Sequence, residues 1–303
     1  MVNRVRQLCQ AILALTLSLL LSTALARQAE YFASPEAGVT ALVAAVRANE
    51  ATKMRAILGR QAGKLTRSGD AVADRKGRDA FLNAYDADHK IVMNGDAEAT
   101  LMVGRDPWPL PFPLVKSSQG WRFDTARGEQ EIIIRRIGRN ELSAIQICLA
   151  IVDAQREYIT RDRDNDGVLE YAAKLVASEG KHDGLYWPAK EGEAPSPLGP
   201  LLAAAAEAGY PSRSLAPYHG YYYRMLRRQG KDAPGGGHAY FSQGQMTGGF
   251  AVIAYPARYG VSGIMSFMVN QDGRVYEKNL GKGTAKIAAK MTTFNPDASW
   301  KQP

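Results

Sequence analysis

Residues 140–160, NELSAIQICLAIVDAQREYIT, separate two parts of the chain that differ in character. Apolar residues recur in this stretch at helical spacing. Asn140 followed by Glu141 is typical of a helix start, because an Asn side chain caps free N–H groups and an acid faces the positive end of the helix dipole. The stretch therefore predicts a long helix that begins at Asn140.

The thiol of Cys148 lies on the apolar face of this predicted helix. The same face carries Leu142, Ile145, Leu149 and Val152. We expect a buried thiol that packs as a small apolar group and does not react. The second cysteine, Cys9, lies in the N-terminal segment described below, so the rest of the chain has no partner for a disulfide.

An acidic loop follows the helix at once. Asp162, Asp164 and Asp166 alternate before a glycine, a pattern that turns carboxylate oxygens toward one point, and Glu170 adds a fourth candidate ligand. These residues predict a calcium site. The twelfth position of a complete EF-hand loop is a bidentate Glu, and here it is Ala173, so the expected affinity is weak. The alternative is a solvated acidic turn held by hydrogen bonds to its own backbone.

The part before the long helix, residues 27–138, predicts an α+β domain. Ser34, Pro35 and Glu36 form a typical helix start, and helical periodicity changes to strand-like alternation further on. Helices are expected after Ser34 and over 50–58 and 73–92, and strands over 97–103, 110–116 and 121–123. Helices followed by a curved antiparallel sheet resemble the NTF2-like and cystatin-like folds.

The part from 139 to 303 predicts the long helix, the acidic loop and an antiparallel β domain. Strands are expected over 220–226, 249–255, 261–269 and 274–279. Asp272-Gly273 between the last two strands is a strong hairpin signal. A leading helix followed by an antiparallel sheet loosely resembles the globular part of type II secretion pseudopilins. The fold class of the whole chain is therefore α+β.

The N-terminal segment, 1–26, resembles a secretory signal peptide. Arg4 and Arg6 precede an apolar run over 11–21, and small side chains at Ala24 and Ala26 fit signal peptidase, so cleavage is expected after Ala26. The run is short for a membrane span, although an uncleaved anchor helix is the alternative. We expect a periplasmic or secreted protein that is not an integral membrane protein after cleavage.

Composition and charge exclude several classes of protein. The 303 residues are 46% hydrophobic and 22% charged, which indicates a globular chain and excludes a disordered tail or a disulfide scaffold. The net charge of +8 is dispersed, with no Lys/Arg stripe, so nucleic acid is not an expected partner. The expected partner is an envelope protein or polymer of unknown identity.

Aromatic residues suggest a platform for a sugar or peptide ligand. Its candidates are Trp187, Tyr218, His219 and Tyr222. Neighbouring residues of a strand point to opposite faces, so the alternative is a tyrosine-rich strand packed on its sheet. Residues 235–238 lack the Lys-Ser/Thr of a phosphate loop, and the four histidines lack metal-binding spacing.

Catalytic signals are weak. The least implausible enzyme is a cell-wall or polysaccharide hydrolase that uses a carboxylate pair, with Asp183 or Glu191 near Trp187 as acid and base. No G-x-S-x-G motif is present. The sequence favours a non-catalytic binding or structural module and keeps the hydrolase as the alternative.

Distinctive strings occur along the chain at 121–125 (WRFDT), 136–141 (RIGRNE), 183–188 (DGLYWP), 196–200 (SPLGP), 218–224 (YHGYYYR), 267–270 (FMVN) and 297–300 (DASW). Together these strings resemble a family of bacterial exported proteins, domain of unknown function 2950. The strings extend over essentially the whole chain after the signal peptide. The resemblance implies a location in the cell envelope and brings no known activity, substrate or catalytic residue.

Overall fold

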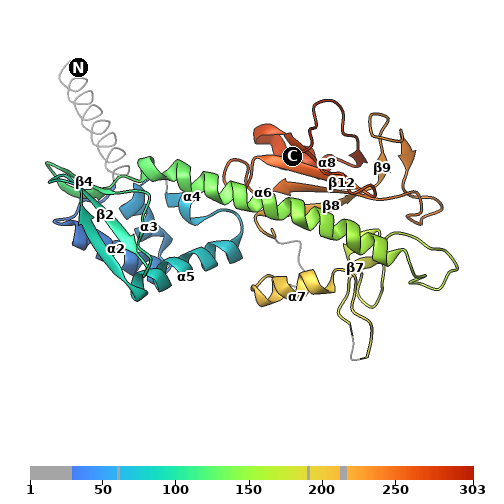
Figure 1. Ribbon diagram of the computed structural model, residues 1–303, viewed down its shortest axis with the longest axis horizontal. Helices are drawn as coiled ribbons and strands as arrows, with labels where there is room; N and C mark the ends of the chain where they lie inside the picture. Colours follow the sequence, from blue (N-terminus) through green and yellow to red (C-terminus); the bar gives the residue numbers. More distant parts are fainter. Residues whose placement is uncertain (1–28, 60–61, 190–191, 212–216) are drawn as a thin grey trace, which may run out of the picture. The chain divides into compact units, whose positions relative to one another are not determined.

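The computed structural model describes residues 29–59, 62–189, 192–211 and 217–303, and the predicted signal peptide lies outside these ranges. The chain divides into two compact units, which we call unit 1 and unit 2. Unit 1 extends to Thr66 and continues over Gly77–Ile132, and unit 2 consists of Arg67–Lys76 and Ile133–Pro303. Helices and antiparallel sheets occur in both, which confirms the α+β class (Figure 1).

The helices of unit 1 begin largely where the sequence predicts them. They are α2 (Pro35–Arg47), α3 (Ala51–Leu58), α4 (Ala62–Thr66) and the part of α5 (Ala71–Ala87) after Lys76. Ser34 caps α2 by accepting a hydrogen bond from the backbone N–H of Ala37 at 3.2 Å, as expected. The third predicted helix was too long, because residues 89–93 form a strand. Their β-branched residues pair with a neighbouring strand, and this pairing outweighs local helical periodicity.

Five strands form the sheet of unit 1. They are β1 (His89–Met93), β2 (Glu98–Val103), β3 (Trp108–Pro109), β4 (Leu114–Ser117) and β5 (Gly120–Phe123). The order is β1-β2-β4-β5, with β3 also paired to β2. The predicted strand over 110–116 begins only at Leu114, since Pro111 and Pro113 have no N–H to donate to a ladder. Leu101, Leu114 and Phe123 are buried against α2 and α3.

The long helix α6 (Thr125–Tyr158) begins well before the predicted start at Asn140. Asn140 is not a cap but lies inside the helix, and its side-chain amide donates to the carbonyl of Ser262 at 2.8 Å. The Glu141 carboxylate accepts from the N–H groups of Ile264 and Met265 at 2.8 and 2.9 Å. The two polar residues that resembled a helix start therefore attach the helix to the loop before β12 (Met265–Asn270).

The buried face of α6 agrees with the predicted one at Cys148 and Val152, which are both buried, and differs from it at the two leucines. Leu142 is 65% exposed and Leu149 is 40% exposed, whereas Ile147, Cys148 and Ile151 are buried. The shift arises because the core of unit 2 contacts α6 along a stripe next to the one predicted from the leucines. The expected burial of Cys148 is confirmed: the thiol is completely buried, and burial raises its pKa to about 12.

The main sheet of unit 2 has four antiparallel strands, in the order β13 (Tyr276–Asn279), β12, β11 (Ala251–Pro256) and β8 (Tyr221–Leu226). The predicted hairpin joins β12 to β13. Gly273 has a φ of +75° there, which favours glycine, and its N–H donates to the carbonyl of Asn270 at 2.9 Å. This turn fixes the register in which Met268 faces Tyr276.

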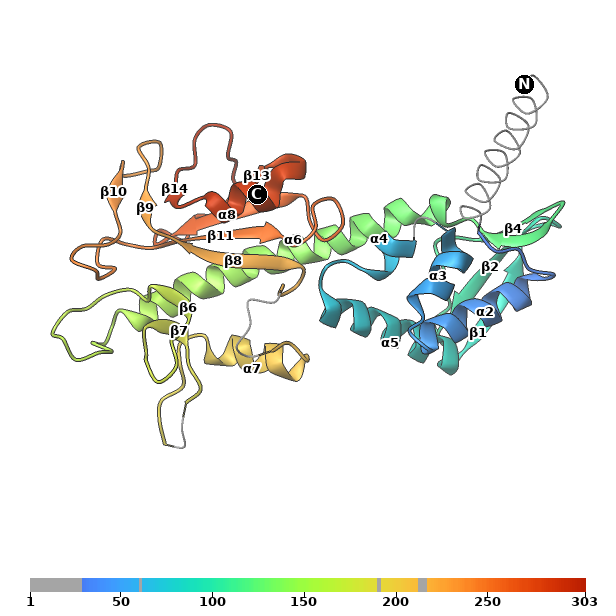
Figure 2. The ribbon, with the colours of Figure 1, turned by 180° about the vertical axis from the view of Figure 1, so that it is seen from behind.

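Two helices cover opposite faces of this sheet. Tyr223 of β8 lies with residues of α6, whereas its neighbour Arg224 donates to the carbonyls of Ala288 and Met291 in and just after α8 (Thr284–Lys290). Successive strand residues point to opposite faces, so α6 and α8 sandwich the sheet, as Figure 2 shows. The largest buried cluster of the described residues lies on these faces.

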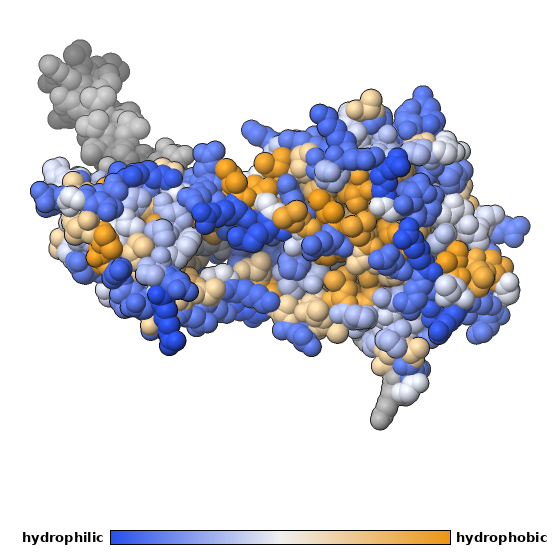
Figure 3. Space-filling model, in the orientation of Figure 1, coloured by the Kyte–Doolittle hydropathy of each residue, from blue (hydrophilic) through white to orange (hydrophobic). Residues whose placement is uncertain are grey.

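Smaller elements complete unit 2. They are β6 (Lys174–Val176), β7 (Gly184–Tyr186), α7 (Gly199–Glu207), β9 (Arg228–Gln229), β10 (His238–Ala239), the short 3-10 helix η2 (Gly281–Gly283) and β14 (Thr293–Phe294). Strands β6 and β7 pair in parallel, and a small sheet has the order β10-β9-β14. On the face drawn in Figure 3, hydrophobic residues over unit 2 are interspersed with hydrophilic ones. No helix in the described ranges is long and apolar enough to cross a membrane.

One buried carboxylate attaches residues 67–76 to the rest of unit 2. Asp70 is 1% exposed and caps the start of α5 by accepting from the N–H of Ala73 at 2.9 Å. Its other oxygen accepts from the hydroxyl of Tyr210 at 2.8 Å and from the N–H of Gly220 at 2.9 Å. These long-range bonds hold the segment against the start of β8.

Candidate functional site

The acidic loop brings three carboxylates together. One oxygen from each of Asp162, Asp164 and Asp166 lies within 4.8 Å of the others, and no other group of three possible His, Cys, Asp or Glu ligands occurs among the described residues. Asp162 also accepts from the N–H groups of Gly167 and Asn165, both at 2.8 Å. These hydrogen bonds lower the pKa of the Asp162 carboxyl, and the one from Gly167 has the largest effect. Such a loop offers oxygen ligands that suit a hard divalent cation.

The fourth predicted ligand has another partner. Glu170 accepts a hydrogen bond from the N–H of Met246 at 2.9 Å, and Asp166 accepts one from the side-chain amide of Gln245. Partial burial is the main cause that raises the pKa of Glu170, and the negative charges of the three aspartates raise it further. The structure therefore gathers the three aspartates and ties Glu170 to the neighbouring loop around Met246.

Arg163 fastens the acidic loop to the core. Its guanidinium carbon lies 5.4 Å from the ring centroid of Tyr158 and 5.5 Å from that of Trp187. Trp187 is only 6% exposed, and its ring centroid lies 4.4 Å from that of His182. Trp187, a predicted platform residue, thus packs beneath the acidic loop in a cation–π arrangement.

Two other predicted platform residues form a cluster with a tyrosine that the sequence analysis missed. The ring centroid of Tyr218 lies 4.8 Å from that of Tyr210 and 4.5 Å from that of His219. Burial lowers the pKa of His219, the charge of Asp70 opposes this effect, and that of Lys76 adds to it. The imidazole is therefore neutral near neutral pH and presents an aromatic face.

Tyr222 lies on the opposite face of β8 from Tyr223, as strand alternation requires. Its ring centroid is 5.6 Å from that of Tyr255 in the adjacent strand. The four predicted platform residues thus occupy three surroundings: Trp187 under the acidic loop, Tyr218 and His219 beside Tyr210, and Tyr222 against Tyr255.

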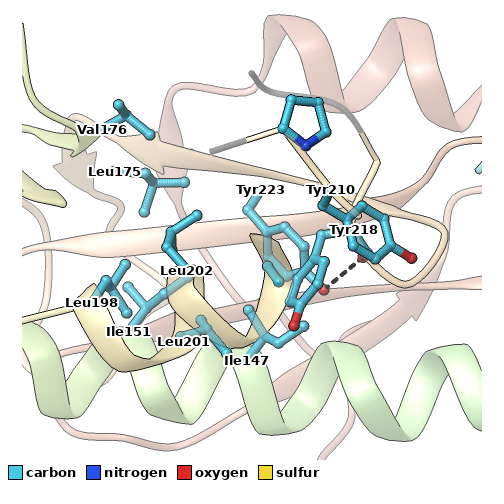
Figure 4. Close-up of a pocket in the computed structure, with 12 residues that line it drawn as sticks. Ile147, Ile151, Leu175, Val176, Leu198, Leu201, Leu202, Tyr210, Tyr218 and Tyr223 are labelled. Carbon is cyan, nitrogen blue, oxygen red and sulfur yellow. Dashed lines mark hydrogen bonds between the residues drawn. The ribbon is translucent and has the colours of Figure 1, made fainter. Parts of the chain in front are cut away.

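A pocket of unit 2 begins where Tyr210 and Tyr218 meet (Figure 4), and we call it the tyrosine pocket. Its volume is about 90 Å³. Its walls come from α6, α7, β6, β8 and the chain after α7, namely Ile147, Ile151, Leu175, Val176, Leu198, Leu201, Leu202, Ala205, Tyr210, Pro211, Tyr218 and Tyr223. None of these side chains is a Lys, Arg, His, Asp or Glu. The walls are therefore apolar apart from three phenol groups.

The three hydroxyls of the tyrosine pocket differ in their partners. Tyr210 donates its hydroxyl hydrogen to Asp70, and Tyr223 directs its own to the carbonyl of Tyr218 at 3.5 Å. The Tyr218 hydroxyl forms no hydrogen bond with any residue that the structure describes. Burial raises the pKa values of all three phenols, so they stay protonated at neutral pH.

The carboxylate proposed for acid–base chemistry is already bound. Asp183 accepts from the ammonium of Lys174 at 2.7 Å, from the N–H of Ser178 at 2.7 Å and from the Ser178 hydroxyl at 2.9 Å. Burial opposes ionisation of Asp183, but these bonds outweigh it and lower its pKa. A general acid needs the opposite shift. Glu191, the second member of the predicted pair, lies outside the described residues.

The glycine-rich segment forms a turn between β9 and β10. The side-chain amide of Gln229 donates to the carbonyls of Pro234 and Gly236 at 2.8 and 2.9 Å. The Nε2 atom of His238 lies 3.1 Å from the carbonyl of Gly248. The contacts of this segment are those of a structural turn, as the missing Lys-Ser/Thr indicates.

Comparison with known proteins places the chain in one family. The chain matches no curated protein and no solved structure, and the resemblances to NTF2-like, cystatin-like and pseudopilin folds stay predictions. A family model described as "Protein of unknown function (DUF2950)" matches residues 29–302, nearly the whole chain. The family resemblance predicted from the sequence is thereby confirmed, and the protein belongs to the DUF2950 family.

Proposed function

We propose that the protein is a non-catalytic binding module of the cell envelope, periplasmic or secreted, and that its ligand binds in the tyrosine pocket. The observation that carries this proposal is the pocket itself, whose walls are apolar and which has a few polar groups at one end, as small-molecule sites have. Leu175, Leu202 and Tyr218 are each only half-buried, so the pocket opens toward solvent.

The export part of the proposal is supported by the N-terminal segment, 1–26. Its basic start, apolar run and Ala24-x-Ala26 ending are typical of a cleaved signal. Mass spectrometry of the protein from fractionated cells tests this, with Arg27 as the expected first residue. Retention of Met1 in the membrane fraction would contradict export by cleavage.

Binding in the pocket is tested with three six-carbon probes, 1-hexanol, hexanoate and hexylamine, followed by saturation-transfer NMR. We expect at least one probe to bind the wild type. Its binding should be lost in Leu202→Trp, because the indole fills the pocket that Leu202 lines. The matched control is Leu142→Trp, since Leu142 is 65% exposed on α6 and lies outside the pocket wall.

Equal binding by both tryptophan variants would show that the probes bind elsewhere, and no binding to the wild type would refute the proposal. Circular dichroism establishes that each variant is folded. A second filling variant, Ala205→Leu, adds a smaller side chain to the same wall and is expected to weaken binding in the same direction.

The hydrolase alternative has less support. Asp183 is engaged by Lys174 and Ser178, and its lowered pKa suits a structural ion pair between β6 and β7. An Asp183→Asn variant is expected to lose stability without losing any ligand binding in the pocket. Hydrolysis of a wall polymer by the wild type that disappears in this variant would favour the alternative.

We propose calcium binding at the acidic loop as a second function, supported by the convergence of the three aspartate carboxylates. An ion that binds only the folded loop stabilises it by about 2.7 kcal/mol at a hundred times its dissociation constant. The expected result is a melting temperature that rises with millimolar calcium, and rises less with magnesium. An Asp162→Asn, Asp164→Asn double variant should not respond.

The control for the calcium experiment is Asp153→Asn, which removes an exposed acid of α6 outside the loop. This variant is expected to respond to calcium as the wild type does. If the double variant responds equally well, the loop is an ordinary acidic turn and the calcium proposal is wrong.

A further inference from the structure

We infer that the tyrosine pocket takes an uncharged, mainly aliphatic compound with one oxygen acceptor, an inference that rests on the proposed function. The first argument is charge. No side chain of the pocket wall carries a charge at neutral pH. The carboxylate behind Tyr210 is that of Asp70, which already accepts from three donors. A charged ligand group would therefore lose its water without gaining an opposite charge in the wall.

The second argument is the direction of the hydroxyl hydrogens. Tyr210 gives its hydrogen to Asp70, and the hydrogen of Tyr223 points to the Tyr218 carbonyl. Tyr218 alone keeps a hydroxyl hydrogen that no described residue accepts. The wall thus offers one donor, and a ligand oxygen, as in an alcohol, ketone or ether, is its complement.

The third argument is size and shape. The pocket volume is about 90 Å³ and the pocket opens toward solvent, so a flexible chain can be enclosed in part and extend through the opening. Ile147, Ile151, Leu198 and Leu202 provide aliphatic walls, and the tyrosines gather at one end. A flexible alkyl chain with its oxygen at the tyrosine end fits this distribution better than a flat ring does.

The test compares the affinities of 1-hexanol, hexanoate and hexylamine for the full mature chain at neutral pH by calorimetry. The three probes share chain length and differ in the charge of one end. We expect 1-hexanol to bind at least about tenfold more tightly than either charged probe, because the wall cannot compensate a buried charge. Equal or tighter binding of hexanoate or hexylamine would overturn the assignment of an uncharged ligand, while the pocket as a binding site would stand.

The donor assignment is tested with Tyr218→Phe, which removes only the hydroxyl. Loss of one neutral hydrogen bond is expected to weaken 1-hexanol about threefold to tenfold. Xenon, which fills apolar cavities without hydrogen bonds, should bind this variant as it binds the wild type. The matched control is Tyr222→Phe, whose ring lies against Tyr255 on the other face of the sheet.

The outcomes separate the two proposals. Unchanged 1-hexanol affinity in Tyr218→Phe would overturn the donor assignment, and weakened xenon binding would show that the substitution merely distorts the pocket and would equally overturn it. Failure of all three six-carbon probes to bind the wild type would refute the proposed function together with this inference.

Discussion

Replacing Asp70 by Ala should destabilise unit 2 strongly. The carboxylate is 1% exposed and accepts three hydrogen bonds, from Ala73, Tyr210 and Gly220. Loss of a helix cap costs about 1 kcal/mol. Each buried donor left without its charged acceptor costs about 1.5–3 kcal/mol, although such losses overlap when the donors share one acceptor. We therefore expect the free energy of unfolding to fall by about 3–5 kcal/mol.

Urea unfolding measures this loss, and hydrogen exchange of the amides in β8 and β11 assigns it to unit 2. The control is Asp153→Ala, which removes an exposed acid from α6 and should change stability by less than about 0.5 kcal/mol. Asp70→Asn should lie between the control and Asp70→Ala, because the amide keeps one acceptor oxygen. A loss below about 1 kcal/mol in Asp70→Ala would refute the idea that this carboxylate holds residues 67–76 in unit 2.

Three further outcomes are expected. Cys148 should resist thiol reagents until unfolding, because burial raises its pKa to about 12; labelling of the native protein at the rate of a free thiol would contradict this. The lowered pKa of His219 means that its contribution to stability is complete above its ordinary value of about 6.5 and is lost as the pH falls. As the pH falls from about 7.5 to about 5, the range in which histidine titrates, the melting temperature of the wild type should therefore fall relative to that of His219→Asn. A difference in melting temperature that stays constant over this range would contradict the prediction. Asn is chosen because it tolerates the positive φ of +50° at this position. Gly263→Ala should cost more than about 2 kcal/mol in urea unfolding, because its Cβ would clash with the Tyr221 hydroxyl, whereas Gly138→Ala, which meets no atom within 4 Å, should gain about 0.5–1 kcal/mol in helix propensity. Equal effects of the two glycine substitutions would show that the close approach is absent.

Local signals in the sequence predicted local features of the fold. The Asp272-Gly273 signal was sufficient to predict the β12–β13 hairpin, because a turn depends mainly on its own residues: the chain reverses over residues 270–273, where the N–H of Gly273 donates to the carbonyl of Asn270. Ser34 likewise predicted the start of α2. The alternating aspartates of the acidic loop are close neighbours along the chain, so their convergence was also predictable.

Features that depend on distant partners were missed. Asn140 and Glu141 have the character of a helix start, yet their partners lie far along the chain, at 262–265. Residues 89–92 were predicted as the end of a helix, but they belong to β1, which pairs with β2. Nothing next to Tyr210 in the sequence indicates the pocket, since its walls come from separate elements that extend from α6 to β8. Such contacts become visible only once the fold brings these elements together.

The placement of residues 67–76 in unit 2 has a consequence for biosynthesis. The ribosome makes this segment before all five strands of unit 1 and long before Tyr210 and Gly220, its hydrogen-bond partners. Unit 1 can form its sheet before residues 67–76 meet their partners, but unit 2 cannot complete its fold until the chain beyond β8 has been synthesised. A gene fragment that starts at residue 133 would encode every strand of the four-stranded sheet of unit 2 and still lack Asp70, the carboxylate that accepts hydrogen bonds from Tyr210 and Gly220. The two units are therefore distinct in the structure but interleaved in the sequence, and no single cut of the polypeptide chain separates them.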